Sequence, residues 1–159
     1  INGVAITGGF ELALACDVLI GSTRARFADT HARVGLMPGW GLSQKLSRVV
    51  GLYRAKEISL TGNFVNAEQA ERWGLLCRVV EPEALLDTCR ALAADMLSCN
   101  PDVLVGYKAI IDRGFGMDYA AARELEREIN RRQMKGVSRE QLAESRRSVT
   151  ERGRKQPHD

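Results

Sequence analysis

Apolar residues follow two different spacings along this chain. Short apolar runs occupy positions 4–6, 17–21, 25–28 and 75–80, and runs of this length are typical of buried β-strands. Between these runs, apolar residues recur three and four positions apart, as at Leu42, Leu46 and Val50, which predicts amphipathic helices. From residue 81 onward the helical spacing continues without another strand-like run. The pattern therefore predicts an α/β region over residues 1–80 and a helical region over residues 81–159.

Residues that begin or end helices divide these regions further. Asn66, with Gln69 three positions later, forms a capping-box pattern, and Gly74 is expected to end that helix. Gly51 is expected to end the helix over residues 42–50. In the helical region we expect four helices, over 82–99, from Pro101 to about 112, from a cap at Asp118 to about 135, and from a capping box of Ser138 and Gln141 to about 152.

Composition narrows the class of protein. The chain has 159 residues, 45% of them hydrophobic, which suits one domain with a core or most of a larger domain. A net charge of +3 is too small to indicate a nucleic-acid partner. Residues 113–155 nevertheless hold twelve lysines and arginines against seven acidic residues. This segment can contact phosphate groups, or it can be a solvated basic helix face.

The cysteines and the length of the apolar runs bear on location. Four cysteines, at 16, 77, 89 and 99, have no metal-ligand spacing and lie in apolar stretches. We therefore predict reduced core cysteines in a cytoplasmic protein with no metal site. No run of about 18 apolar residues is present, so we expect no membrane partner. The chain begins inside a predicted strand without an initiator methionine, and we expect further sequence upstream.

A glycine pair followed by a glutamate is the first candidate site. Gly8 and Gly9 precede the apolar helix that carries Glu11. Glycines let backbone N–H groups approach a ligand closely, and the start of a helix favours negative charge. Such a place can hold an oxyanion with an acid or base beside it. The alternative is a glycine turn followed by an ordinary core helix.

The order of these motifs resembles the crotonase superfamily, which is the enoyl-CoA hydratase/isomerase superfamily. The matching positions are Asn2-Gly3, Gly8-Gly9-x-Glu11-Leu12-Ala13, Cys16-Asp17, Phe27, Gly35-x-x-Pro38-Gly39-x-Gly41, Leu46, Leu60-Thr61-Gly62 and Ala67-x-x-Ala70-x-x-x-Gly74-Leu75. The resemblance implies a crotonase-like ββα superhelix, incomplete at its N-terminus, followed by a helical C-terminal oligomerisation region. Family members are longer at the N-terminus, so the chain looks like the C-terminal three-fifths of such an enzyme.

The resemblance also implies roles for the candidate residues. In the family, two backbone N–H groups hold the oxygen of an acyl-CoA thioester; Gly8 matches one of these donors, and the other lies upstream of residue 1. Glu11 matches the first of two carboxylates that hold and activate water. The second carboxylate falls at position 31, where this chain has His31. Imidazole can give or take a proton near neutral pH, so His31 can replace that carboxylate or be only structural. Asp29, two residues away, can reach the site if the loop is re-registered.

Further positions are implied as substrate contacts. Gly9, Asp29, Pro38 and Trp40 are expected to contact the substrate. Trp40 lines the acyl pocket or is an ordinary packed aromatic. Three basic residues match the segment that approaches the phosphates of CoA in the family, with a charged solvated chain end as the alternative. These residues are Arg152, Arg154 and Lys155.

The implied function is that of an enoyl-CoA hydratase, a lyase of fatty acid β-oxidation. CoA is then part of the substrate, and no cofactor is permanently bound. Isomerase, decarboxylase or thioesterase activity on the same fold stays open, as does a non-catalytic fragment or subunit. We expect residues 1–159 alone to be inactive, and the complete protein to be a homotrimer or hexamer assembled through the helical region.

Overall fold

The computed structural model describes residues 1–155, with the side chains of Arg139, Gln141 and Lys155 outside the description. The chain forms two compact units, residues 1–94 and residues 95–159. The chain passes from the first unit to the second within one helix, α6 (Leu85–Leu97). The division predicted after residue 80 describes a change from an α/β region to a helical region. It does not describe these compact units, and it stays a prediction.

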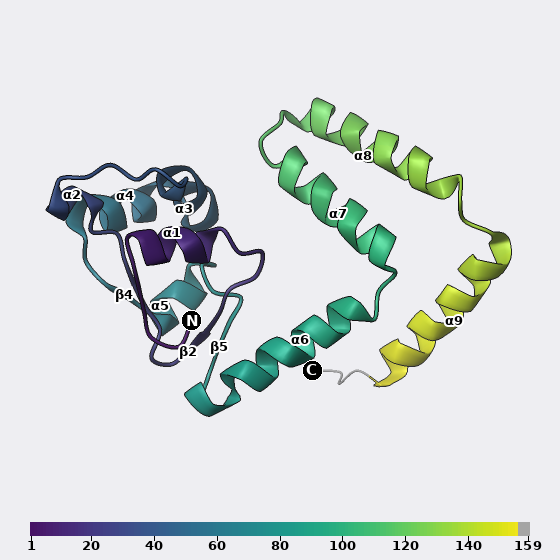
Figure 1. Cartoon of the computed structure of the whole chain (residues 1–159), viewed down its shortest axis with the longest axis horizontal. Helices are drawn as coiled ribbons and strands as arrows, with labels where there is room; N and C mark the ends of the chain where they lie inside the picture. Colours follow the sequence, from purple (N-terminus) through teal and green to yellow (C-terminus); the bar gives the residue numbers. More distant parts are fainter. Residues whose placement is uncertain (156–159) are drawn as a thin grey trace. The chain divides into compact units, whose positions relative to one another are not determined.

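The first unit contains both short strands and short helices (Figure 1). Its elements, in chain order, are β1 (Val4–Ile6), α1 (Gly8–Leu14), β2 (Ile20–Ser22), β3 (Arg26–Ala28), α2 (His31–Val34), α3 (Leu42–Val50), α4 (Leu52–Thr61), β4 (Val65–Asn66), α5 (Ala67–Arg72), β5 (Arg78–Val80), the 3-10 turn η1 (Pro82–Ala84) and most of α6. The four predicted strands are present, three of them shorter than the apolar runs. The two-residue strand β4 and the four-residue helix α2 were not predicted, because elements this short carry no periodic signal.

The strands form two small sheets with separate partners. β3 lies in the middle of the first sheet, parallel to β1 and antiparallel to β4, with Ala5 opposite Phe27. β2 pairs in parallel with β5 in the second sheet, with Gly21 opposite Val79. A side chain at Gly21 would displace its neighbours, because an added Cβ atom would lie 2.5 Å from a side-chain carbon of Leu76. β2 and β3 are thus consecutive in sequence but belong to different sheets.

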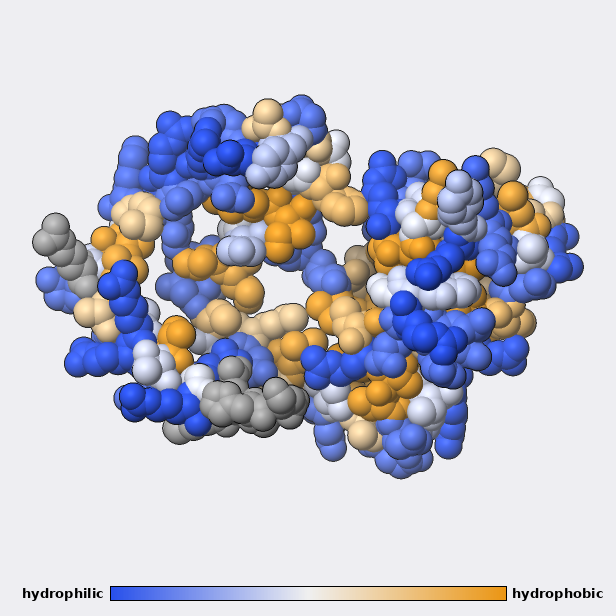
Figure 2. Space-filling model, turned by 180° about the vertical axis from the view of Figure 1, so that it is seen from behind, coloured by the Kyte–Doolittle hydropathy of each residue, from blue (hydrophilic) through white to orange (hydrophobic). Residues whose placement is uncertain are grey.

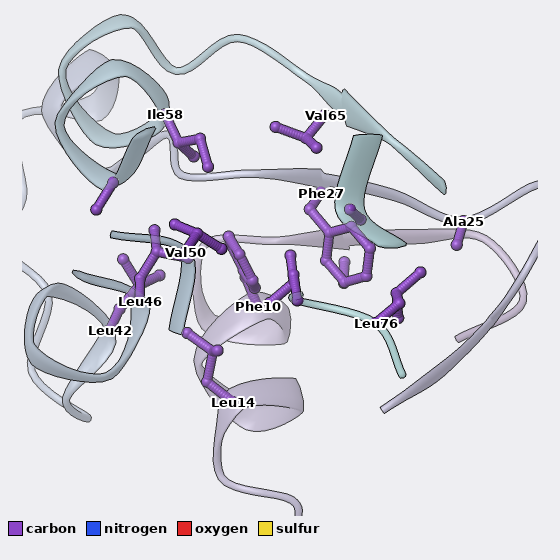
Figure 3. Packing of buried hydrophobic residues seen from close by; sticks show 14 of the residues in the cluster. Phe10, Leu14, Ala25, Phe27, Leu42, Leu46, Val50, Ile58, Val65 and Leu76 are labelled. Atoms are coloured by element: carbon purple, nitrogen blue, oxygen red, sulfur yellow. The ribbon is translucent and has the colours of Figure 1, made fainter. Parts of the chain in front are cut away.

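The core of the first unit lies between α1, α3 and the first sheet (Figure 3). Phe10 of α1 and Phe27 of β3 are fully buried, with their ring centroids 5.2 Å apart. Leu42 and Leu46 of α3 are also fully buried, as their helical spacing predicts. Truncating a buried phenylalanine to alanine costs about 3–5 kcal/mol, so this cluster fixes the position of α1 against β3.

The second unit is helical, as predicted. It contains the end of α6 and three helices, α7 (Pro101–Gly114), α8 (Tyr119–Met134) and α9 (Arg139–Lys155). α7 and α8 pack against each other and lie side by side in Figure 1. Asn100 caps α7 and Asp118 caps α8 through their side chains. Figure 2 shows apolar side chains at the surface among the charged ones.

Two expectations from the sequence differ from the structure. The predicted helix over 82–99 begins as η1 and becomes α-helical only at Leu85. The prediction that the cysteines belong to the core is wrong, because three are exposed and one is half-buried in this chain. Their neighbours in the sequence are apolar, but the cysteines lie at turns and on outward helix positions. The exposed ones are Cys16, Cys77 and Cys99, and the half-buried one is Cys89.

Candidate functional site

The glycine pair is the first turn of α1, directly after β1. The helix begins at Gly8, with Thr7 as the preceding cap residue. Thr7 has φ 51° and ψ −110°, and a positive φ is uncommon for a β-branched residue. The first N–H groups of a helix have no acceptor within the helix itself. The start of α1 therefore presents backbone donors beside two residues that have no side chain.

Glu11 lies in the first turn of the same helix and is only 4% exposed. Its neighbour Phe10 is anchored in the core, which fixes the direction of the helix (Figure 3). The Oε1 atom of Glu11 accepts a hydrogen bond of 2.8 Å from the backbone N–H of Trp40. A buried carboxylate needs such a partner. Oε2 is the carboxylate oxygen on the His31 side.

His31 opens α2 and is held by Asp29. One carboxylate oxygen of Asp29, Oδ1, is 2.7 Å from Nδ1 of the imidazole ring. The same oxygen accepts the backbone N–H of His31 at 3.1 Å. Asp29 is 2% exposed and His31 is 7% exposed, so the pair is buried. The ring is therefore fixed in orientation by a residue two positions earlier.

The other ring nitrogen of His31 faces Glu11. Nε2 of His31 lies 3.7 Å from Oε2 of Glu11. This separation is longer than a direct hydrogen bond, and one water molecule can contact both atoms. His31, at the position that matches the family's second carboxylate, therefore lies beside Glu11. Asp29, His31 and Glu11 thus form a buried row of carboxylate, imidazole and carboxylate.

Two threonines connect the start of α1 to this row. The hydroxyl groups of Thr7 and Thr30 are hydrogen-bonded to each other. The backbone N–H of Thr30 donates to the Thr7 hydroxyl at 3.3 Å, and the N–H of Thr7 donates to the carbonyl of Ala28 at 3.0 Å. These bonds compensate for the positive φ of Thr7, and a sparsely populated backbone conformation of this kind costs about 1–3 kcal/mol. They hold the glycine turn against the segment that leads into His31.

The predicted acyl-side residues lie next to the row. Pro38 and Trp40 belong to the turn before α3, and the N–H of Trp40 binds Glu11. A Cβ atom added at Gly8 would lie 3.6 Å from Cζ3 of Trp40, so the indole lies over the glycine turn. Trp40 is also 71% exposed, so among the described residues it is not an ordinary packed aromatic. Gly9 has no other atom within 4 Å of an added Cβ.

The three predicted phosphate contacts all belong to α9 of the second unit. Arg152 of α9 forms an ion pair with Asp95, 2.7 Å between Nη2 and Oδ1. Arg154 is exposed. The side chain of Lys155 lies outside the described residues. The structure thus gives Arg152 a structural partner and leaves the role of these three residues a prediction.

Sequence reasoning missed Thr7 and Thr30, and it placed Asp29 among the substrate contacts, whereas the structure bonds its carboxylate to His31. Thr7 has no sequence signal, because its partner lies in another element. Asp29 does have a signal: an aspartate two residues before a backbone N–H is the spacing of an Asx turn. Among residues 1–155, no group of three or more side chains is arranged to hold a metal ion. Every helix in that range is too short or too polar to cross a bilayer.

Comparison with known proteins gives a consistent picture. The model of the family described as "Enoyl-CoA hydratase/isomerase" matches residues 1–158. A protein of Arabidopsis thaliana named "Probable enoyl-CoA hydratase 1, peroxisomal" is 41% identical over 157 residues, 99% of this chain and 59% of the relative. A "Short-chain-enoyl-CoA hydratase" of Clostridium acetobutylicum is 38% identical over 128 residues, 80% of this chain and 49% of the relative. The chain thus spans about half to three-fifths of these relatives.

Solved structures show the same arrangement of elements. An enoyl-CoA hydratase subunit from Geobacillus kaustophilus superposes with a TM-score of 0.85 at 31% identity, covering 99% of this chain and 60% of that one. A putative enoyl-CoA hydratase from Thermobifida fusca, solved in complex with acetoacetyl-CoA, superposes with a TM-score of 0.80 at 30% identity, covering 85% and 53%. These likenesses confirm the predicted fold class.

Proposed function

We propose that this chain, which belongs to the enoyl-CoA hydratase/isomerase family, is the part of an enoyl-CoA hydratase that carries its proton-transfer groups. The observation that supports this best is the approach of Glu11 Oε2 and His31 Nε2 to 3.7 Å, beside the glycine start of α1. A site that adds water needs two groups to handle protons and donors for a developing negative charge. All three kinds of group lie together in the first unit.

The reaction requires a balanced movement of protons. The oxygen of water forms a bond to C3 of a 2-enoyl-CoA, and the electrons of the double bond pass toward the thioester oxygen. The backbone N–H of Gly8 is proposed to stabilise this oxygen as an enolate, and donors of this kind usually supply the largest single contribution to the rate. The proton that leaves the water is returned to C2 through Glu11 and His31, which restores the thioester carbonyl. The second oxyanion donor is expected from outside residues 1–159.

Glu11 and His31 share the proton work in this proposal. A water molecule that lies beside Oε2 and Nε2 can donate one hydrogen to each. Glu11 is proposed as the base that removes a proton from this water. His31 is proposed as the second proton-transfer group, in the position of the family's second carboxylate. Each such role contributes a factor of roughly 10²–10⁴ to the rate.

The substrate proposed is an acyl-CoA, with CoA as part of the substrate and no permanently bound cofactor. The exposed indole of Trp40 and the neighbouring Pro38 and Gly9 are proposed to line the acyl side. Arg152, Arg154 and Lys155 are proposed to contact CoA phosphates, although Arg152 would first have to leave Asp95. The relative from Thermobifida fusca, whose structure contains acetoacetyl-CoA, supports a thioester ligand for this fold.

An enoyl-CoA isomerase is the second candidate. Replacement of one carboxylate by His31 favours it, because moving a proton along the acyl chain needs no attacking water. Glu11 alone can carry a proton between two carbon atoms. Decarboxylase and thioesterase activities, and a non-catalytic role, have no specific observation in their favour.

Assembly and location complete the proposal. We propose a homotrimer or hexamer built on the helical region, supported by the exposed apolar side chains of the second unit, among them Val105, Tyr107 and Ile111. A place in fatty acid β-oxidation follows from the proposed reaction. A cytoplasmic location is also proposed, and it competes with the peroxisome named for the Arabidopsis relative. Imaging of the tagged intact protein decides between these locations.

An activity assay of the intact protein tests the function. A short and a long 2-enoyl-CoA are supplied separately, and loss of the conjugated thioester absorbance is followed. The corresponding 3-enoyl-CoA is the matched comparison, because its conversion would raise that absorbance. Consumption of the 2-enoyl-CoA with formation of a 3-hydroxyacyl-CoA supports the hydratase. Conversion of the 3-enoyl-CoA alone would replace it with the isomerase.

A further inference from the structure

We propose that Asp29 is a positioning residue that keeps a proton on Nδ1 of His31, so that Nε2 is the nitrogen that exchanges protons beside Glu11. The inference rests on the proposed function, because it assigns how His31 takes part in that site. The observation behind it is the row Asp29, His31 and Glu11, in which the two ring nitrogens face different carboxylates.

The contact between Asp29 and the ring fixes one proton. An ionised carboxylate only accepts hydrogen bonds, so a ring nitrogen 2.7 Å from Oδ1 must carry the hydrogen. The distance is in the range of charge-assisted hydrogen bonds. Asp29 is 2% exposed, so water does not compete for this oxygen. In the neutral ring, a hydrogen on Nδ1 leaves Nε2 with a lone pair.

That lone pair faces an acceptor. Oε1 of Glu11 is already bonded to the N–H of Trp40, and Oε2 lies 3.7 Å from Nε2. A bare nitrogen and an ionised oxygen at this distance need a hydrogen donor between them. A water molecule with two O–H groups, or one proton shared through such a water, meets that need. Among the described residues, the ionisable groups in contact with the ring are Asp29 and Glu11.

The hydrogen bond between Asp29 and the imidazole ring of His31 is not needed to form the turn at the start of α2. An Asx turn at the start of α2 needs only the bond from the backbone N–H of His31 to Oδ1. The additional bond to Nδ1 sets which form of the imidazole is present, and that form decides whether a histidine can act as a base through its other nitrogen. Asp29→Asn keeps an oxygen at this place and removes the charge. Asp29→Ala removes the acceptor altogether.

The direct test is the protonation of each ring nitrogen in the intact protein labelled with ¹⁵N-histidine. The chain has two histidines, His31 and His158, and His31→Gln assigns the signals by removing one set. We expect Nδ1 of His31 to carry a hydrogen and Nε2 to be the nitrogen without one in the neutral ring. A hydrogen on Nε2 with a bare Nδ1 in the wild type would overturn the proposal. This readout needs no turnover, so it stands apart from the hydratase proposal.

Variants of Asp29 test the cause. In Asp29→Ala we expect both imidazole forms to be populated, with turnover reduced about 10²-fold and KM changed only a few-fold. Asp29→Asn is expected to keep the hydrogen on Nδ1 and to recover part of the turnover. Glu83→Ala, which removes an exposed carboxylate, is the matched control and should behave as the wild type. Should Asp29→Ala fail to fold, Asp29→Asn and the wild-type spectrum still decide the matter. An unchanged Nδ1–H form in a folded Asp29→Ala would show that Asp29 is not its cause.

Discussion

The imidazole of His31 and the carboxylate of Glu11 lie 3.7 Å apart, from the first turns of two different helices. Both side chains are almost fully buried. Each is held on its far side, Glu11 by the N–H of Trp40 and His31 by Asp29. The atoms left facing each other, Oε2 of Glu11 and Nε2 of His31, are therefore the ones available for chemistry.

Replacing the Glu11 carboxylate by an amide should separate catalysis from folding. Glu11→Gln keeps an oxygen that can accept the N–H of Trp40, so the turn before α3 is retained. It removes the base, and we expect hydration to fall at least about 10²-fold while the affinity for an acyl-CoA stays within a few-fold. Steady-state kinetics together with acyl-CoA binding by calorimetry checks this. Near-full turnover in the variant would remove Glu11 from the mechanism.

Adding a side chain at Gly8 should damage the oxyanion site without unfolding the protein. A Cβ atom there meets Trp40 only at an ordinary contact distance of 3.6 Å. The side chain of Gly8→Val would occupy the place where the thioester oxygen approaches, and the loss of one donor costs roughly 10²–10³ in turnover. Gly3→Val is the control, because an added Cβ there meets no other atom within 4 Å. Ordinary kinetics in a folded Gly8→Val protein would refute the oxyanion role.

Removing the Thr7 hydroxyl should weaken the link between α1 and the segment before α2. Thr7→Val keeps the shape of the side chain but deprives Thr30 of two hydrogen bonds. Because the site is partly exposed, we expect a loss of about 1 kcal/mol in the free energy of unfolding, measured with urea. Thr150→Val, at an exposed position of α9, should change it by less than about 0.5 kcal/mol. Equal free energies of unfolding for the two variants would mean that the hydrogen bonds between Thr7 and Thr30 do not stabilise the protein.

Assembly should depend on the apolar surface of the second unit. Ile111 of α7 is 58% exposed in the single chain, a costly arrangement for a large apolar side chain. We expect the intact protein to sediment as a homo-oligomer at micromolar concentration. Ile111→Asp should shift it toward smaller species. Arg113→Asp introduces the same residue at an exposed polar position of the same helix and should leave the oligomer intact. A wild-type monomer would contradict the proposed assembly.

Local signals in the sequence predicted several elements well, because they act over three or four residues. The capping box of Asn66 and Gln69 is present with both of its hydrogen bonds, and Asp118 caps α8 as expected. The predicted capping box at Ser138 involves the side chain of Gln141, which lies outside the described residues. The burial of the cysteines was predicted wrongly, because an apolar neighbourhood does not say which face of an element points outward.

In the site too, contacts that form only through tertiary packing could not be predicted from the sequence. Glu11 and His31 could be paired from the sequence, since they match the positions of the family's two carboxylates. The bond between Thr7 and Thr30 could not, because it exists only once α1 has docked beside the segment that follows β3. The role of Asp29 depends on which way the ring of His31 faces, and that is set by tertiary packing.

The pH dependence of 2-enoyl-CoA hydration by wild type and His31→Gln tests the proposed site most directly. Histidine is the side chain that ordinarily changes charge between about pH 5 and 8. With His31 as the second proton-transfer group, we expect the pH dependence of turnover to differ between the two proteins. His31→Gln should fall at least about 10²-fold in turnover. The same rate and the same pH profile in both proteins would contradict the proposal and leave His31 a structural residue.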